Sequence, residues 1–432
     1  MNMLDKFFKL SQHNTTIRRE VIAGFTTFLT MAYIIAVNPN ILADAGMDKG
    51  ALITVTALTA AFGTLLMGLW INVPLAMAPG MGLNAFFAYT LVVGQGISWQ
   101  TALGVVFISG IAFLVLTAFG FREKIVSAIP HSLRIAIPGG IGLFITFIGL
   151  QNMELVILSE STLVTVGTFE EPVVLGLIGL AITLVLEARN WRGSILIGIV
   201  TTTLLGVLFG SISLPGTLIS IPPSMTPTAF ELDIAGAFRW GLMGAIFSFM
   251  FVDLFDSVGT IVACSYEADL VEEDGSIENI SQMLGADAIA TSVGALLGTS
   301  TTTTYVESAS GIEEGGRTGL TAVIVALLFL AALIFTPVIS IIPGYATAPA
   351  LIVVGLFMFK NLKEIDFSSF ADLVPAFMTI ALMPLTYSIS MGLTFGFLSF
   401  ILIKLVTGRA TEISLIMWVI GVFSALNLLL TM

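Results

Sequence analysis

The chain has 432 residues, of which 56% are hydrophobic and 10% are charged, and its mean hydropathy is +1.03. Soluble domains carry roughly a quarter charged residues, so this composition excludes an ordinary soluble protein and indicates a membrane protein. The net charge of −12 argues against nucleic acid as a partner. One cysteine excludes an intrachain disulfide, and two separate histidines form no metal-binding cluster, so we expect neither a metal nor a cofactor.

Apolar stretches long enough to cross a bilayer, about 20 residues each, recur along the whole chain. Residues 1–20 are polar and run into the first stretch without a cleavage site, so we expect no signal peptide. Segments 173–187 and 300–312 look too short to cross alone. Charge-free windows and Gly/Pro punctuation predict fourteen or fifteen helical segments near 21–42, 51–71, 74–94, 100–120, 135–153, 173–187, 194–212, 240–264, 280–298, 300–312, 318–336, 343–359, 371–386, 387–406 and 412–431.

The basic residues predict which way these segments face. With residues 1–20 in the cytoplasm, fourteen of the sixteen Lys and Arg residues fall on the cytoplasmic side, and only Lys49 and Arg239 do not. The positive-inside rule therefore favours a cytoplasmic N-terminus. The last run, 411–432, could be a fifteenth crossing, a half-helix or a surface segment. The fourteen residues are Lys6, Lys9, Arg18, Arg19, Arg122, Lys124, Arg134, Arg189, Arg192, Arg317, Lys360, Lys363, Lys404 and Arg409.

A proline-rich connection at 211–239 separates seven predicted segments from the rest. Because seven is odd, a second copy of the first half would be inserted upside down, as in transporters built from inverted repeats. The third segment of each half is interrupted by residues that break or weaken helices: NVPLAMAPGMGLNAFFAY at 72–89 and GTSTTTTYVESASG at 298–311. Paired interruptions of this kind point to a binding site near the middle of the membrane.

Carboxylates lie inside three of the predicted segments. The eighth segment carries Asp253 and Asp256, three residues apart and hence on one helical face, the tenth carries Glu307, and the ninth carries Asp287 near its start. A carboxylate at mid-bilayer costs at least about 2.5 to 3.5 kcal/mol, and no Lys or Arg lies in an apolar segment to pair with one. We expect Asp253, Asp256 and Glu307 to face a shared polar cavity, although Asp253 could instead bond to nearby backbone or hydroxyl groups. Asp287 is expected to be structural or near the interface.

The four threonines at 301–304 predict a break in the tenth segment. Consecutive β-branched residues favour extended backbone, which a bilayer tolerates only where it is buried in protein or lines a cavity. A half-helix beginning near Tyr305 would direct its free N–H groups into the membrane centre, with Tyr305 and Glu307 at its mouth. The alternative is an ordinary helix N-cap made by the threonine hydroxyls.

The third segment carries an amide at its break. Residues 78–84 read APGMGLN, and Asn84 can donate and accept at once, which suits a heterocycle with alternating N–H and C=O groups. The alternative is a hydrogen bond between two helices. No G-x-S-x-G, H-E-x-x-H or cysteine-based nucleophile pattern is present, so we do not expect an enzyme.

Four stretches together resemble a known family: AGFTTFLTMAYIIAVNPNIL, APGMGLNAFFAY, DLFDSVGT and GTSTTTTYVESASGIEEGGRTGL. They are similar to nucleobase:cation symporter-2 (nucleobase-ascorbate) transporters, specifically to the AzgA-like branch of hypoxanthine, guanine and adenine permeases, over residues 15–405. The resemblance implies an all-α polytopic membrane fold of about fourteen segments in two inverted seven-segment repeats, with short extended strands breaking segments 3 and 10. It also implies a core domain, 21–121 with 238–337, and a gate domain, 122–212 with 338–410.

The resemblance further implies a proton symporter that imports purine nucleobases across the cytoplasmic membrane, with the purine held between the two broken segments. Glu307 would be the main acceptor for purine N–H groups, and Asp253 or Asp256 would take the coupling proton. By position, the substrate-binding residues would be Glu307, Asp256, Asp253, Tyr305, Asn84 and Thr304.

Alternatives from the same fold stay open. The eighth segment lacks the Glu-x-x-x-His arrangement of uracil permeases, which favours the purine branch and leaves two aspartates as alternatives for the coupling proton. A transporter of xanthine, uracil or an anion is the alternative, although anion-transporting relatives lack the carboxylate at Glu307. The preferred purine and the formation of a homodimer through the gate domain are left open by the sequence.

Overall fold

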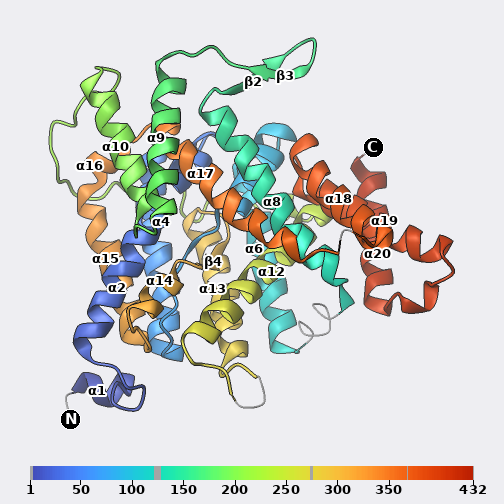
Figure 1. Ribbon diagram of the computed structural model, residues 1–432, viewed down its shortest axis with the longest axis horizontal. Coiled ribbons are helices and arrows are strands. Elements are labelled where there is room, and N and C mark those ends of the chain that lie inside the picture. The colour runs from blue at the N-terminus through green and yellow to red at the C-terminus, as the bar shows by residue number, and fades with distance from the viewer. Residues whose placement is uncertain (1–2, 121–127, 273–275, 367, 432) are drawn as a thin grey trace.

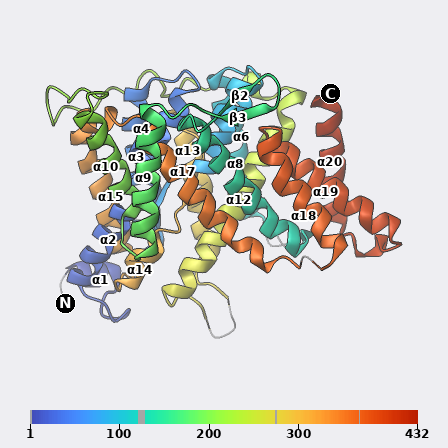
Figure 2. The ribbon, with the colours of Figure 1, turned by 45° about the horizontal axis from the view of Figure 1, so that its top comes forward.

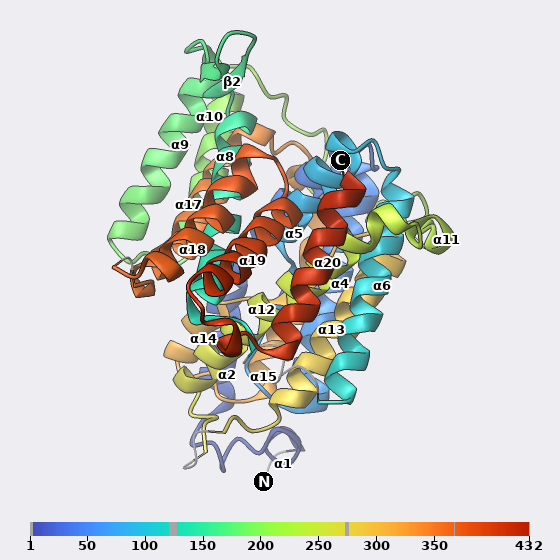
Figure 3. The same cartoon turned by 90° about the vertical axis from the view of Figure 1, so that its right-hand side faces the viewer.

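The computed structural model describes residues 3–120, 128–272, 276–366 and 368–431. Arg122, Lys124 and the predicted domain boundary at 121–122 lie outside these ranges. The short helix α1 (Met3–Phe8) lies at one end of the molecule, and the hairpin of β2 (Val156–Ser159) and β3 (Leu163–Val166) lies at the opposite end (Figures 1 and 3). This hairpin is exposed and was not predicted.

Helices in the first half follow the predicted segments closely. They are α2 (Ile17–Met31), α3 (Ile34–Ala43), α4 (Lys49–Leu65) with its π-helical continuation η1 (Leu66–Ile71), α5 (Met81–Ala85) with its π-helical continuation η2 (Phe86–Gly94), α6 (Trp99–Ala118), α8 (His131–Asn152), α9 (Glu171–Ala188) and α10 (Ser194–Leu208).

The second half begins after an irregular connection and is again helical. Its elements are α11 (Ile234–Ala237), η3 (Trp240–Leu242), α12 (Met243–Glu267), α13 (Ile280–Leu297), α14 (Ser308–Glu313), α15 (Gly319–Ala332), η4 (Leu333–Phe335), α16 (Thr336–Ser340), α17 (Gly344–Phe359), η5 (Lys360–Glu364), α18 (Phe370–Leu385), α19 (Ile389–Val406), η6 (Ala410–Glu412) and α20 (Leu415–Thr431).

Ten helices in the described part of the chain are long and apolar enough to cross a membrane, and four shorter apolar helices accompany them. Segment 173–187 is one of the ten, so the expectation that it is too short was wrong. Helix α9 has 18 residues because it starts earlier, at Glu171, with Pro172 in its first turn. Proline fits there because its missing N–H would have no partner within the helix.

The predicted breaks in segments 3 and 10 are both extended strands, and they pair with each other (Figure 1). Strand β1 (Met77–Pro79) lies antiparallel to β4 (Thr302–Thr304), and two further backbone bonds flank the pair, from Gly80 N to Thr301 O at 3.0 Å and from Tyr305 N to Ala76 O at 2.9 Å. All six strand residues are buried. The backbone groups exposed by each break are therefore satisfied inside the protein, as membrane depth requires.

The turn from α13 into β4 requires a glycine. Gly298 has φ +99°, a left-handed conformation, and its N–H bonds to the Gly294 carbonyl at 3.0 Å. A Cβ added to Gly298 would lie 2.5 Å from Thr228. Both the conformation and the close approach favour glycine, so the helix ends here and the strand begins at a set position.

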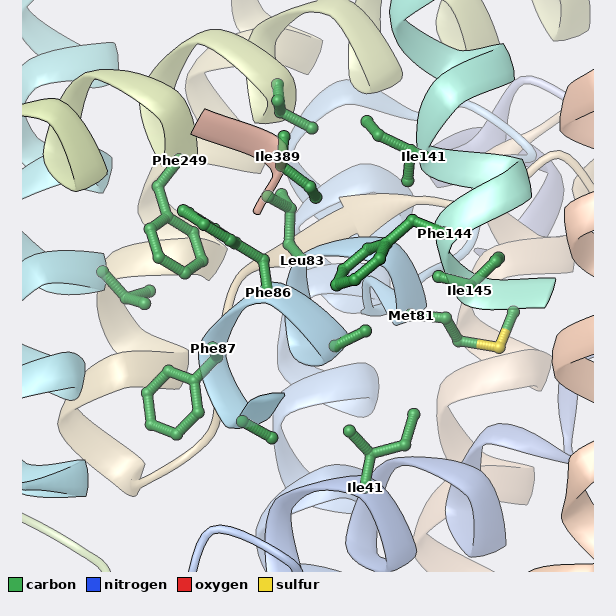
Figure 4. Close-up of a cluster of buried hydrophobic side chains, with 14 of the residues drawn as sticks. Ile41, Met81, Leu83, Phe86, Phe87, Ile141, Phe144, Ile145, Phe249 and Ile389 are labelled. Atoms are coloured by element: carbon green, nitrogen blue, oxygen red, sulfur yellow. The ribbon is translucent and has the colours of Figure 1, made fainter. Parts of the chain in front are cut away.

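Two groups of helices surround the paired strands. In one, α6 packs against α13, and α15 packs against α2 and α4; in the other, α8 packs against α17 and α18, and α18 packs against α19. The groups meet where α5 lies against α8. Figure 4 shows Met81 and Leu83 of α5 beside Ile141, Phe144 and Ile145 of α8, an apolar contact between the two groups.

The last apolar run forms one continuous helix, α20, packed against α19 and α12. Its Asn427 amide donates to the Ser390 hydroxyl at 3.1 Å and to the Thr394 hydroxyl at 3.0 Å. The helix ends toward the β2–β3 hairpin, away from α1 (Figure 2). Of the three alternatives, the structure therefore favours a helix within the bundle over a detached surface segment.

Candidate functional site

A cavity of about 110 Å³, here called the central cavity, lies beside the paired strands. One wall is polar and comes from the α2–α3 junction, α12 and the chain around β4. The opposite wall is apolar and comes from α8 and α17. The polar wall includes Tyr33, Asp256, Thr260, Thr303, Thr304, Tyr305 and Glu307, and the apolar wall includes Ile141, Val354, Phe357 and Met358.

Glu307 lies in the central cavity just before α14 and is partly buried. Its Oε1 accepts a hydrogen bond of 2.5 Å from the Tyr33 hydroxyl. Among the ion pairs of the described residues, none involves Glu307. The carboxylate therefore keeps acceptor capacity for a donor group inside the cavity.

Asp256 is the second carboxylate of the cavity wall. It lies on α12 and is partly buried, and no described residue donates a hydrogen bond to it. A buried carboxylate without a partner is costly. Asp256 and Glu307 together make the cavity able to accept hydrogen bonds from a ligand or to hold a proton.

Asp253 does not line the central cavity, contrary to the prediction of a shared cavity. It is 1% exposed, and its Oδ2 accepts from the Thr291 hydroxyl of α13 at 3.1 Å. Residues three apart on a helix differ in direction by about 60°. That angle is enough to direct Asp256 into the cavity and Asp253 behind β4. The structure thus has the alternative considered from the sequence, a bond to a nearby hydroxyl.

Asp287 has the structural position that was expected of it. Its Oδ2 accepts from both the N–H and the hydroxyl of Thr304, each at 3.0 Å, so it anchors β4 to α13. It is fully buried rather than near an interface. Asp287 and Asp253 each retain one buried oxygen, Oδ1, without a hydrogen-bond partner among the described residues.

Thr304 and Tyr305 line the cavity, but their polar groups are used within the protein. The Thr304 hydroxyl bonds to Asp287, and the Tyr305 hydroxyl donates to the Pro79 carbonyl at 2.6 Å. Helix α14 begins at Ser308, three residues after the predicted start. Its N-cap residue is Glu307 and no side chain caps it, so the alternative of a threonine N-cap is wrong.

Asn84 does not reach the central cavity. It is fully buried, and its amide donates to Asn38 Oδ1 at 2.7 Å, while the Asn38 amide donates to Thr56 at 2.7 Å and to Thr299 at 3.1 Å. The structure therefore has the alternative weighed for Asn84, a hydrogen bond between helices, in place of the predicted contact with a ligand.

Two parts of the site were missed by the sequence analysis. Tyr33 is a polar aromatic residue inside segment 21–42, and a buried tyrosine hydroxyl usually has a partner, which was the available signal. The apolar wall gave no signal, because Val354, Phe357 and Met358 resemble any other residues of an apolar segment.

A second cavity of about 400 Å³, here called the vestibule, shares Val306, Glu307 and Phe357 with the central cavity. Its rim includes the α9–α10 connection and α14. Arg192 of that connection forms ion pairs with Glu313, at 3.6 Å, and with Glu314. Glu307 therefore lies between the central cavity and the vestibule.

Hydrogen bonds join the two groups of helices toward the opposite end. The Asn152 amide of α8 donates to the Tyr89 hydroxyl of η2 at 3.1 Å, and this hydroxyl donates to Asp44 at 2.7 Å. The Thr90 hydroxyl donates to the Tyr387 carbonyl at 2.5 Å. The two groups are thus tied together on one side of the central cavity and separated by the vestibule on the other.

Comparison with known proteins gives a consistent result. The model of a family described as a permease family matches residues 18–395. The chain is 46% identical over 413 residues to the adenine permease AdeP of Escherichia coli (strain K12), covering 95% of this chain and 93% of that one. It is 43% identical over 424 residues to the guanine/hypoxanthine permease PbuG of Bacillus subtilis (strain 168), covering 95% and 96%.

Among solved structures, the chain is similar to the transmembrane domain of a cyanobacterium bicarbonate transporter, BicA. The TM-score is 0.67 at 18% sequence identity, and the match covers 88% of this chain and 96% of that one. Identity this low supports the fold alone.

Proposed function

This chain belongs to the permease family of nucleobase:cation symporters-2, and we propose from that premise that it carries purine nucleobases across the cell membrane together with protons. It is a multi-pass membrane transporter rather than an enzyme. The relatives named as adenine and guanine/hypoxanthine permeases support a purine as the substrate.

The observation that carries the proposal is the pair of carboxylates, Glu307 and Asp256, on the wall of a cavity whose other side is apolar. A neutral purine needs acceptors for its N–H groups and an apolar surface for its ring faces. Carboxylates accept strong charge-assisted bonds from N–H groups, and Phe357 with Met358 offers the apolar surface. An anion would meet two negative charges here, which argues against the alternative of anion transport.

We assign the coupling proton to Asp256 and the role of substrate anchor to Glu307. Asp256 receives no hydrogen bond from the described residues, whereas Asp253 bonds to Thr291. Burial disfavours the charged form of an unpartnered carboxylate, so protonation of Asp256 lowers the cost of moving it past the apolar wall. A proton and a purine bound together would then cross as a neutral load.

Alternating access needs two bodies that move past each other. The packing of α6 with α13 and of α15 with α2 and α4 supports the core domain, 21–121 with 238–337, and the packing of α8 with α17 and α18 supports the gate domain, 122–212 with 338–410. The vestibule has Arg192 at its rim, one of the basic residues that favour a cytoplasmic side. We infer that the N-terminus is cytoplasmic and that this conformation opens inward.

The test is uptake of labelled hypoxanthine into liposomes that contain the purified protein. We expect an inward-directed proton gradient to drive accumulation, a protonophore to abolish it, and guanine or adenine to compete while uracil does not. Uptake that ignores the proton gradient would overturn the coupling. Competition by uracil but not by purines would overturn the assigned substrate.

A further inference from the structure

Tyr33 holds one oxygen of the proposed substrate anchor. It lies at the junction of α2 and α3, is 1% exposed, and donates its hydroxyl proton to Glu307 Oε1 at 2.5 Å. A tyrosine hydroxyl has a single proton, so Tyr33 cannot donate to a ligand while this bond exists. The chain that links the two residues is long, since they are 274 positions apart.

The bond makes the two oxygens of Glu307 unequal. Oε1 is engaged by Tyr33, whereas no described side chain donates to Oε2. Because Glu307 lines both the central cavity and the vestibule, the bond also restrains the carboxylate between them. A ligand in the central cavity therefore meets one fully available acceptor oxygen, held in place, instead of two.

We propose that Tyr33 is a specificity-determining positioning residue: by occupying Oε1, it limits Glu307 to one purine N–H donor and so favours hypoxanthine over guanine. The proposal rests on the proposed purine transport. Hypoxanthine presents a single N–H, at N1, on the edge where guanine presents two donors side by side, N1–H and the 2-amino group. A carboxylate with both oxygens available accepts two such parallel bonds.

The experiment compares Tyr33→Phe with the wild-type protein, each purified in detergent, by competition of hypoxanthine and guanine for binding. Removing the hydroxyl frees Oε1 and releases the carboxylate. We expect hypoxanthine to bind about three- to tenfold more weakly and the guanine-to-hypoxanthine affinity ratio to rise about fivefold, the effect of roughly one hydrogen bond. Tyr266→Phe, at a 61% exposed position on α12, is the matched control and should change neither value.

An unchanged affinity ratio in Tyr33→Phe overturns the proposal, even if both affinities fall, because a merely structural role would weaken both purines alike. Equal melting temperatures of the variant and the wild type exclude misfolding as the cause of a change. If Tyr33→Phe does not accumulate, Tyr33→Met, which also lacks the donor and adapts its shape, carries the same expectation. Binding of neither purine by the wild type overturns the proposed function itself, a result distinct from an unchanged ratio.

Discussion

At the scale of single residues, the two aspartates of α12 show how position decides the role of a carboxylate. Asp256 lines the central cavity without a hydrogen bond from the described residues, and Asp253, one turn earlier, bonds to Thr291 behind β4. Both are the same residue type on the same helix. Only the neighbouring elements distinguish a group that can meet a ligand from one that supports the site.

Substitution of these two aspartates should therefore separate their roles. Asparagine cannot take up a proton, so we expect Asp256→Asn to lower gradient-driven accumulation by about tenfold or more while purine binding stays within about threefold. Asp253→Asn should impair binding and transport together, because it alters the support of β4. Binding and liposome uptake measure the two effects, with Glu160→Gln in the exposed β2–β3 hairpin as a control. Loss of coupling in Asp253→Asn alone would reverse the assignment.

At the scale of elements, the β1–β4 pair depends on the helices beside it. Two strands of three residues are marginally stable alone, and each has N–H groups that point away from its partner. Side chains accept these bonds: Met77 N–H bonds to Thr64 of α4 at 2.9 Å, Thr302 N–H to Thr291 of α13 at 3.1 Å, and Thr304 N–H to Asp287 of α13 at 3.0 Å. The two breaks thus form one supported element rather than two loops.

Removal of the Asp287 carboxylate should destabilise this element. Asp287→Ala leaves the buried N–H and hydroxyl of Thr304 without an acceptor, and each unsatisfied group costs about 1–3 kcal/mol. We expect a lower melting temperature and weaker purine binding, with Asp287→Asn intermediate because its amide oxygen still accepts. A wild-type melting temperature for the alanine variant would show that Asp287 does not anchor β4.

At the scale of the whole molecule, the two groups of helices divide the work of the site. One group supplies the polar wall of the central cavity and the other supplies the apolar wall. They are joined by the Asn152–Tyr89 and Thr90–Tyr387 hydrogen bonds toward one end, and the vestibule with its Arg192 ion pairs separates them toward the other. Movement of one group past the other would transfer the polar wall between the two sides.

The Arg192 ion pairs should restrain access through the vestibule. Ser310 lines the vestibule, and the single cysteine, Cys264, is buried, so a Ser310→Cys variant offers one accessible thiol. We expect a membrane-impermeant maleimide to label it from the cytoplasmic side, and Arg192→Ala to raise the labelling rate by up to about fivefold, since exposed ion pairs contribute about 0–1 kcal/mol. Labelling from the outside only would contradict the inward-open assignment.

The sequence by itself determined the class of protein, the course of its segments and the two breaks. These features are local, because a charge-free run, a proline or four consecutive threonines acts on its own stretch of chain wherever that stretch is packed. The cost of an intramembrane carboxylate is local as well. Glu307 and Asp256 could therefore be selected from the sequence, and both lie in the central cavity.

Only the tertiary structure decided which side chains meet. Tyr33 bonds to Glu307 across 274 positions, Asn84 bonds to Asn38 instead of facing the cavity, and Asp253 lies behind β4. The apolar wall became visible only when α8 and α17 were placed opposite the strands. The physical reason is that helix packing decides which face of each helix meets which neighbour, and the spacing of residues along one chain does not contain that information.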